Sequence, residues 1–395
     1  MEKPQKFSTS WTESAIDNLL LRIGATAFLV LIALSQKLWL TDRAFPLMPA
    51  WEGFSVSHTF NLVLLLVLVG LLVAKAVFPA KGLGLIIVPV VILLVLIDLN
   101  RLQPWTYILL LLFALSGIKH LFKVKGLVLY GVRILIIGTF LWTGISKLNP
   151  HFLENTFLTI LTKALKVQDT TFFVNNPEFG YFFGLTEILV ALLLLFQKTR
   201  ILAVCMIVFT HLFICYFVSP LALGLDWIVI PWNLFMASWV VIVFTKVLNP
   251  VDFDWGFDSA KAIKYGFTFV VLVLPSLNLI GKWDNFMSFN FFSDKTTKLI
   301  IGVESTQIPN LSPEIQKRFK TVPGGGGGQM LDLLEWSFDE INVPHYPEEW
   351  VLDRVCKSFC QSGIPEKSII FLKIKGSLLS KNVERTGCQS LEYKE

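Results

Sequence analysis

The sequence predicts an all-α polytopic membrane protein that ends in a small α+β domain outside the membrane. Three observations lead to this fold class. Hydrophobic residues make up 54% of the 395-residue chain and charged residues only 16%, whereas soluble proteins average about 45–50% and about 25%. Runs of about 18 or more apolar residues recur between Leu19 and Ile280, and each is long enough to span a bilayer. After residue 281 the chain becomes polar.

This composition excludes a disordered chain, a collagen-like chain and a nucleic-acid partner. Lys and Arg outnumber Asp and Glu by 34 to 29. The excess belongs to the first 281 residues, because residues 282–395 hold 14 basic and 15 acidic side chains. A basic excess in a membrane region indicates its orientation in the bilayer.

The apolar runs predict about nine transmembrane helices within residues 17–281, preceded by an amphipathic N-terminal segment over residues 1–16. The third and fourth spans are short. The nine expected spans are 17–38, 57–78, 83–98, 104–118, 126–146, 179–197, 200–219, 226–246 and 262–281.

The distribution of Lys and Arg predicts which loops are cytoplasmic. Basic residues gather in alternate connections, for example at 119–125 and at 198–200, whereas the connections at 39–56 and 99–103 are poorer in them. Cytoplasmic loops carry this excess in membrane proteins. We therefore expect a multi-pass protein of the cell inner membrane with a cytoplasmic N-terminus and, after nine spans, a periplasmic tail.

Residues 282–395 form the expected external domain. Gly324 to Gly328 follow a proline and predict a flexible linker. Thr297–Glu304 and Ser368–Lys375 have the pattern of strands, and Pro347 begins an expected helix through Gln361, since proline suits the first helical turn. The tail therefore has the composition of a small α+β domain.

Three cysteines of the tail are disulfide candidates. Cys356 and Cys360 lie four residues apart on the expected helix, where disulfide geometry disfavours a bond between them. A bond from either one to Cys388 is the more natural pairing, and it fits an oxidising exterior; three unpaired thiols are the alternative. No metal site is expected, because His345 is the only nearby histidine and no CxxC motif occurs.

Ionisable residues inside the spans are the first candidates for function, because a charge at bilayer depth is costly. Arg133, Glu187 and His211 lie in the fifth, sixth and seventh spans. Helix rise places Glu187 and His211 at similar depth, so we expect them to pair, with Arg133 as counter-charge. Such a cluster is either a structural contact between helices or the lining of an outward-facing pocket.

Further candidates lie near the outer ends of two spans. Lys147 ends the fifth span, after Trp142 and after Gly144, whose small size lets another helix approach. An amine in apolar surroundings can become a base, so Lys147 is the candidate catalytic residue. Asp226, Trp232 and Asn233 begin the eighth span, with Asp226 expected to be structural. Asp98 and Arg101 lie at the outer end of the third.

Several short motifs, in this order, resemble the HTTM membrane domain of vitamin K-dependent gamma-carboxylases and their bacterial relatives, and more distantly DoxX-like proteins. The clearest is FLWTGISKLNPHF at Phe140–Phe152. The resemblance covers about residues 15–285. The other matching segments are Ile97–Tyr107, Thr210–His211, Pro231–Asn233 and, in the tails of bacterial members, Ile341–Glu349.

The resemblance implies a role for Lys147, because the lysine of this motif is regarded in the carboxylases as the base that deprotonates reduced vitamin K. Two departures argue against gamma-carboxylation here. The family's Asn-His pair reads Pro104-Trp105 in this chain, so the imidazole is missing. The tail is also too short for the large peptide-binding domain.

Our leading hypothesis is an outward-facing intramembrane pocket for a lipid-soluble molecule such as a quinone or a lipid. Its expected lining is Trp142, Glu187, His211, Trp232 and Asn233, and whether chemistry occurs there is left open. The alternative is a non-enzymatic component of an envelope complex that docks a partner protein on its external domain. A transporter fits less well, since paired interrupted spans are not evident.

Overall fold

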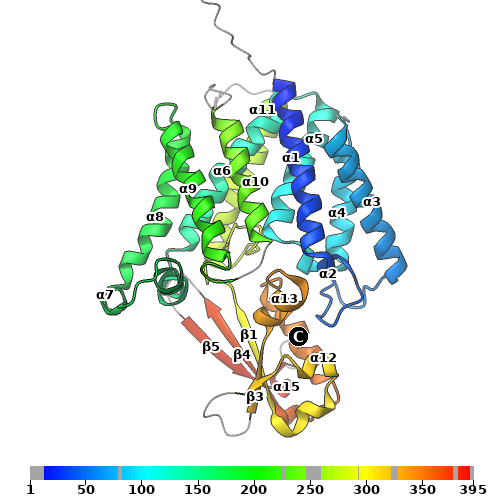
Figure 1. Ribbon diagram of the computed structural model, residues 1–395. Helices are drawn as coiled ribbons and strands as arrows, with labels where there is room; N and C mark the ends of the chain where they lie inside the picture. The colour runs from blue at the N-terminus through cyan, green and yellow to red at the C-terminus, as the bar shows by residue number, and fades with distance from the viewer. Residues whose placement is uncertain are drawn as a thin grey trace, which may run out of the picture.

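A computed structural model describes residues 13–78, 82–224, 228–245, 259–291, 293–321, 328–376 and 381–391. Figure 1 shows two parts: a bundle of helices that stand side by side, and a smaller domain with a β-sheet at one end of the bundle. The helix α1 begins at the opposite end, far from this tail domain.

The bundle contains a helix at each of the nine expected places. The helices of this region are α1 (Glu13–Leu34), α2 (Gln36–Trp39), α3 (His58–Val77), α4 (Gly84–Ile97), α5 (Pro104–Phe122), α6 (Leu127–Ser146), α7 (Thr171–Asn175), α8 (Tyr181–Leu195), α9 (Arg200–Val218), α10 (Val229–Thr245) and α11 (Ser259–Thr268). A π-helical turn and a 3₁₀ segment extend α11 from Phe269 to Ile280. The long connection after α6 contains π-helical turns at Phe152–Phe157 and Ile160–Ala164.

Seven of the helical segments within the described residues are long and apolar enough to cross a membrane. The count of nine spans is therefore not confirmed. The helix α4 has 14 residues, about 21 Å at 1.5 Å per residue, against a hydrocarbon core of about 30 Å. It ends at Asp98, where the backbone becomes extended. The carboxylate of Asp98 accepts a hydrogen bond from the backbone N–H of Asn100 in the 3₁₀ turn that follows. The helix α10 has 17 residues and borders residues outside the described ranges.

The helix α6 lies at the centre of the bundle. Of an 18-residue apolar stretch in α6, 89% is buried inside the protein, whereas the corresponding share is 22% in α3 and 33% in α9. The outer helices present large apolar side chains to the surface, such as Leu66 of α3 and Phe209 of α9, as lipid-facing helices do. Polar groups on α6 therefore lie in the interior of the bundle.

The tail domain contains a five-stranded antiparallel sheet in the order β2-β3-β1-β4-β5. Its elements are β1 (Lys298–Glu304), α12 (Pro313–Gln316), β2 (Lys320–Thr321), β3 (Gly328–Asp332), α13 (Leu333–Ile341), α14 (Glu349–Cys360), β4 (Ile369–Gly376), β5 (Lys381–Thr386) and α15 (Cys388–Leu391). The two expected strands and the expected helix are confirmed as β1, β4 and α14. Of the expected glycine linker, residues 324–327 lie outside the described residues.

Alternation along the strands explains the core of the tail. In the paired strands β1 and β4, Ile301 lies opposite Phe371, and both side chains are fully buried. The helix α14 contributes Val351, Leu352 and Val355 to the same cluster. The buried Lys373 of β4 points to this side and pairs with Asp353 of α14, because a buried amine needs a counter-charge.

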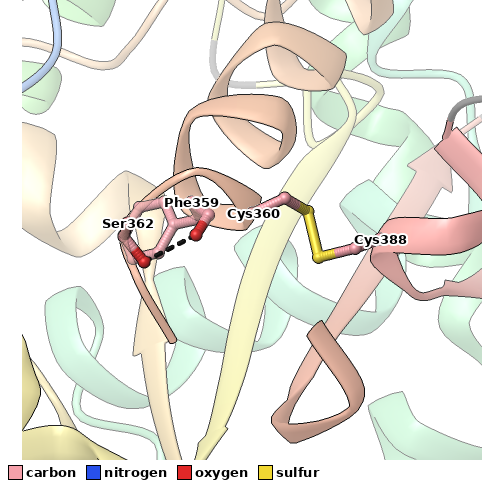
Figure 2. Close-up of a disulfide and its surroundings, with 4 residues drawn as sticks. All are labelled: Phe359, Cys360, Ser362 and Cys388. Atoms are coloured by element: carbon pink, nitrogen blue, oxygen red, sulfur yellow. Dashed lines mark hydrogen bonds between the residues drawn. A yellow bond between two sulfur atoms is a disulfide. The ribbon is translucent and has the colours of Figure 1, made fainter. Parts of the chain in front are cut away.

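The predicted disulfide of the tail joins Cys360 at the end of α14 to Cys388 at the start of α15 (Figure 2). Their sulfur atoms lie 2.09 Å apart. Cys356, one turn earlier, is a free and fully buried thiol, and burial raises its pKa to about 12. Cys356 lies in the core of the tail and takes no part in the disulfide.

A polar network fixes the tail domain to the bundle, and we call it the junction network. On the bundle side Asp98 accepts from Arg43 at 2.5 Å and from Asn100 at 2.9 Å. The Asp98 and Arg43 side chains are both fully buried. Its bundle members are Arg43, Asp98, Asn100, Arg101 and Gln103, and its tail members are Glu340, Pro344 and Tyr346.

Four hydrogen bonds of this network cross between the two parts. Asn100 accepts from the backbone N–H of Tyr346 at 3.0 Å, and Gln103 donates to the carbonyl of Pro344 at 2.8 Å. Glu340 accepts from the backbone N–H groups of Ala44 and Phe45 at 2.6 and 2.8 Å. The tail segment Ile341–Glu349, noticed in the sequence, is therefore a docking segment for the bundle.

Candidate functional site

The candidate site begins with a close contact between α6 and α8. A Cβ atom added at Gly144 would lie 2.7 Å from the backbone carbonyl oxygen of Gly184, and one added at Gly184 would lie 2.7 Å from the oxygen of Gly144. No side chain fits between the helices here. The small residue expected at Gly144 therefore does let another helix approach, and that helix carries Glu187 one turn further along.

Lys147 and Glu187 form an ion pair across this contact. The Nζ atom of Lys147 lies 2.7 Å from Oε2 of Glu187, and the two side chains are only 11% and 13% exposed. Lys147 caps the C-terminal end of α6, and its ammonium group also points to the carbonyl of Thr143 at 3.4 Å. The lysine therefore turns back along its own helix instead of reaching out of the bundle.

His211 of α9 lies beside this pair and contacts α10. Its Nδ1 atom and the Oδ1 atom of Asn233 are 2.7 Å apart. The carboxylate of Glu187 is near enough to interact electrostatically with the imidazole, and the ring of Phe140 packs against it edge-on at 5.6 Å. Four helices thus bring Lys147, Glu187, His211 and Asn233 into one buried group, which we call the membrane site.

The hydrogen bonds of Asn233 determine how His211 is protonated. The Nδ2 group of Asn233 donates to the carbonyl of Val229 at 2.8 Å, so its Oδ1 atom faces His211 and accepts from Nδ1–H. A neutral imidazole with its proton on Nδ1 has a lone pair on Nε2; this tautomer is assigned from the hydrogen-bond network. The Nε2 atom is buried and has no hydrogen-bond partner among the described residues. It can therefore accept a hydrogen bond from a hydroxyl group.

Arg133 does not join the membrane site as expected. It lies fourteen residues before Lys147 on α6, about 21 Å along the axis. Its guanidinium group donates to the carbonyl of Val243 at 3.3 Å and packs over the ring of Phe244. Arg133 therefore packs against the end of α10 that is far from the tail.

Trp142 also faces away from His211. It follows Phe140 by two residues, which is about 200° around a helix, and it shares the face of Gly138, which packs against Val271. Its indole N–H is buried without a hydrogen-bond partner in the described part of the chain. Trp232 is half-buried and packs against Phe235, one residue from Asn233.

The remaining candidates fall outside the membrane site. Asp226 lies outside the described residues. Asp98 and Arg101 belong to the junction network. Trp105, where the resemblance expects an imidazole, packs against Phe28 and Trp39 at 5.8 and 6.1 Å between ring centres. In residues 13–78, 82–224 and the other described ranges, no cluster of three or more His, Cys, Asp or Glu side chains could hold a metal ion.

A second buried polar cluster, which the sequence did not reveal, lies where the bundle meets the tail. The hydroxyl group of Tyr346 donates to Asp284, and Glu348 accepts from the backbone and side-chain amides of Asn285, both at 2.9 Å. Burial raises the pKa of both carboxyl groups. Burial also raises the pKa of the Tyr346 hydroxyl. The only signal was the number of Asn and Asp residues between 278 and 294.

Comparisons with protein-family models, with curated proteins and with solved structures find no match for this chain. The resemblance to the HTTM domain therefore stays a prediction. The chemistry of the membrane site has to follow from its own atoms.

Proposed function

We propose that the protein binds a lipid-soluble small molecule with a hydroxyl-bearing head, such as a quinol or a lipid, at the membrane site. The observation that carries the proposal is the buried Nε2 atom of His211, which has no hydrogen-bond partner among the described residues. A buried acceptor without a partner costs about 1–3 kcal/mol. A ligand hydroxyl that donates to this nitrogen would recover that cost.

The ion pair beside His211 supports a ligand that carries or exchanges a proton. The Lys147 ammonium group can donate to a carbonyl or hydroxyl oxygen, and the Glu187 carboxylate can accept from one. Both side chains retain about a tenth of their exposure, so a ligand head can reach them from one side. We place no covalent step at Lys147, and gamma-carboxylation is not the reaction we propose.

We propose the orientation that the basic loops favour. The membrane site lies at the ends of α6, α8, α9 and α10 nearest the tail domain, because Lys147 ends α6 and His211 lies seven residues before the end of α9. With the tail on the periplasmic side of the inner membrane, the ligand binds in the outer half of the bilayer.

A direct binding measurement tests this function. The full chain, purified in mild detergent, is titrated with a short-chain quinol while tryptophan fluorescence is recorded, and the lipids that co-purify are identified by mass spectrometry. We expect saturable binding that His211→Phe weakens about tenfold or more, as the loss of one buried hydrogen bond predicts.

His58→Phe is the matched control, because His58 is exposed at the start of α3 and bonds only Thr41 among the described residues. It should bind as the unaltered protein does. Equal binding by the His211→Phe variant, with its fold intact, would show that the imidazole does not bind the ligand. No bound quinol and no enriched lipid in the unaltered protein would refute the function itself.

The alternative is a non-enzymatic envelope component, and one observation favours it. The face of the sheet away from α14 carries partly exposed apolar side chains from three strands: Ile300, Ile370, Leu372, Ile374 and Val383. Apolar patches outside the membrane often bind another protein. A stoichiometric partner that co-purifies with the full chain, and is lost with Leu372→Glu but not with His211→Phe, would favour this function over the first.

A further inference from the structure

A cavity lies at the end of the bundle opposite the tail domain. Its volume is about 520 Å³, and it is enclosed by the first turns of α1, the last turns of α3 and α5, and the start of α6. Ligand sites in proteins range from about 300 to 1,000 Å³, so the cavity is large enough for a small ligand or a lipid head group. It is separate from the membrane site, because the helix that both share, α6, contributes its first residues to the cavity and its last residues to the membrane site.

The acidic groups of the cavity already have partners within the protein. Asp17 pairs with Lys119 and also accepts from the backbone N–H of Leu129 at 3.2 Å. Glu13 accepts from the backbone N–H of Gly126, and its carboxylate lies 3.9 Å from Lys119. One lysine and the N-terminal end of α6 thus neutralise both carboxylates.

Three further lysines line the same cavity: Lys75, Lys123 and Lys125. Lys75 is in the last turn of α3 and is only 3% exposed. Lys123 and Lys125 are exposed in the turn between α5 and α6 and form no ion pair with any described residue. Among the described residues of the lining, four lysines face two carboxylates, so 4 − 2 leaves two positive charges in excess.

Apolar surface adjoins this charge. Phe78 follows α3 three residues after Lys75, and Phe122 precedes Lys123; they are 62% and 64% exposed. Leu21 and Val128 contribute to the cavity wall. Basic pockets between membrane helices bind anionic head groups, and the neighbouring apolar side chains would lie against acyl chains.

We propose that this cavity binds a phosphate-bearing anion, either the head group of an anionic membrane lipid or a soluble phosphate ester. Lys75 supplies positive charge from the wall of α3, and Lys123 and Lys125 supply it from the rim. The carboxylates of Asp17 and Glu13 do not repel the ligand strongly, because Lys119 and backbone N–H groups bind them. This site is independent of the function proposed for the membrane site.

Native mass spectrometry of the full chain in mild detergent tests the proposal. The protein is titrated with dioleoyl phosphatidylglycerol, with dioleoyl phosphatidylcholine and with inorganic pyrophosphate. We expect one anionic probe to bind more tightly than phosphatidylcholine. Each rim lysine near an anionic surface contributes about fivefold in affinity, so Lys125→Gln should weaken binding about fivefold and Lys123→Gln with Lys125→Gln about 25-fold.

Lys198→Gln is the matched control, because Lys198 is exposed in the turn between α8 and α9 at the same end of the bundle but outside the cavity. Unchanged binding by this variant, together with losses at the rim, supports the site. Preference for phosphatidylglycerol identifies a lipid head group, and pyrophosphate binding with the same dependence identifies a soluble ester. The proposal is wrong if Lys198→Gln weakens binding as much as Lys125→Gln, or if neither anion binds more tightly than phosphatidylcholine.

Discussion

The junction network and the membrane site contain similar side chains, but the two regions differ in how fully those side chains are bonded. At the junction, both carboxylate oxygens of Asp98 accept hydrogen bonds from the side chains of Arg43 and Asn100. At the membrane site, His211 is also buried, yet its Nε2 atom has no partner in the described part of the chain. A saturated network holds parts together, whereas a buried group with a free lone pair can receive a ligand.

The largest expected effect tests the saturated region. Asp98→Ala leaves the buried guanidinium groups of Arg43 and Arg101 without their counter-charge, and breaking a buried pair in this way costs about 3–5 kcal/mol. We expect the free energy of unfolding in detergent to fall by that amount. Asp339→Ala, which breaks a bond to Arg318 at the surface, should cost under about 1 kcal/mol. Equal losses would show that the junction network is not specially stabilising.

The close helix contact at the membrane site gives the next largest effect. Gly144→Ala places a methyl group 2.7 Å from the backbone oxygen of Gly184, so the helices must separate at a cost of about 1–3 kcal/mol. Gly70→Ala on α3 is the control, since nothing lies within 4 Å of its added Cβ atom. The control should be neutral or more stable by up to about 1 kcal/mol. Thermal unfolding of both variants in one detergent measures the difference.

Two buried tryptophans compare a bonded group with an unbonded one directly. The indole N–H of Trp336 donates to Glu340 at 2.8 Å, so Trp336→Phe leaves a buried carboxylate oxygen with one bond fewer and should cost about 1–3 kcal/mol. Trp142→Phe removes an N–H that has no partner among the described residues and should cost less, under about 1 kcal/mol. A larger loss at Trp142 would mean that its N–H is bonded in solution.

The smallest effect concerns pH. Burial raises the pKa of Asp284 and of Glu348, so the folded protein holds their proton more tightly than the unfolded chain. Their contribution is therefore present below the ordinary carboxyl pKa of about 4 and is lost as pH rises through the raised values. After correction for the intrinsic acceleration of amide exchange with pH, hydrogen exchange at the junction should become faster over this window as pH rises.

His345 acts in the opposite direction and has to be separated from this effect. Burial lowers its pKa, so its contribution is present above about 6.5 and is lost as pH falls. The Asp284→Asn variant keeps His345. The difference in hydrogen exchange between this variant and the unaltered protein therefore cancels the contribution of His345. A difference that does not change with pH would contradict the assignment to the two carboxyl groups.

Much of the fold follows from patterns within short stretches of sequence. Apolar length located the helices, strand-like segments located β1 and β4, and helix spacing left Cys388 to pair with one of two cysteines. The count of nine spans is not confirmed at α4, because a helix lies at the expected place but is only 14 residues long. Composition detects an apolar run, but it does not detect the point at which the carboxylate of Asp98 accepts a backbone hydrogen bond and ends the helix.

The site was predicted less completely than the fold. Depth along single helices drew attention to Glu187 and His211, which lie near each other in the structure, but depth carries no information about the rotation of a helix about its axis. In the structure the carboxylate of Glu187 pairs with Lys147 instead of His211. Arg133 lies far away along α6 and pairs with neither. The bonds of the junction network between the bundle and the tail were missed for a different reason. Its partners are more than 200 residues apart in sequence, as for Asn100 and Tyr346, and no local pattern connects them.

The bond between Ala44 and Glu340 also limits when the two parts of the protein can join during synthesis. The two residues are 296 positions apart. At about 5–20 residues per second, a ribosome needs about 15 to 60 s to reach the second after making the first. During that interval the loop after α1 is already made but its partner does not yet exist. The tail can therefore close onto the bundle only after Glu340 has been made, when the described helices of the bundle already exist.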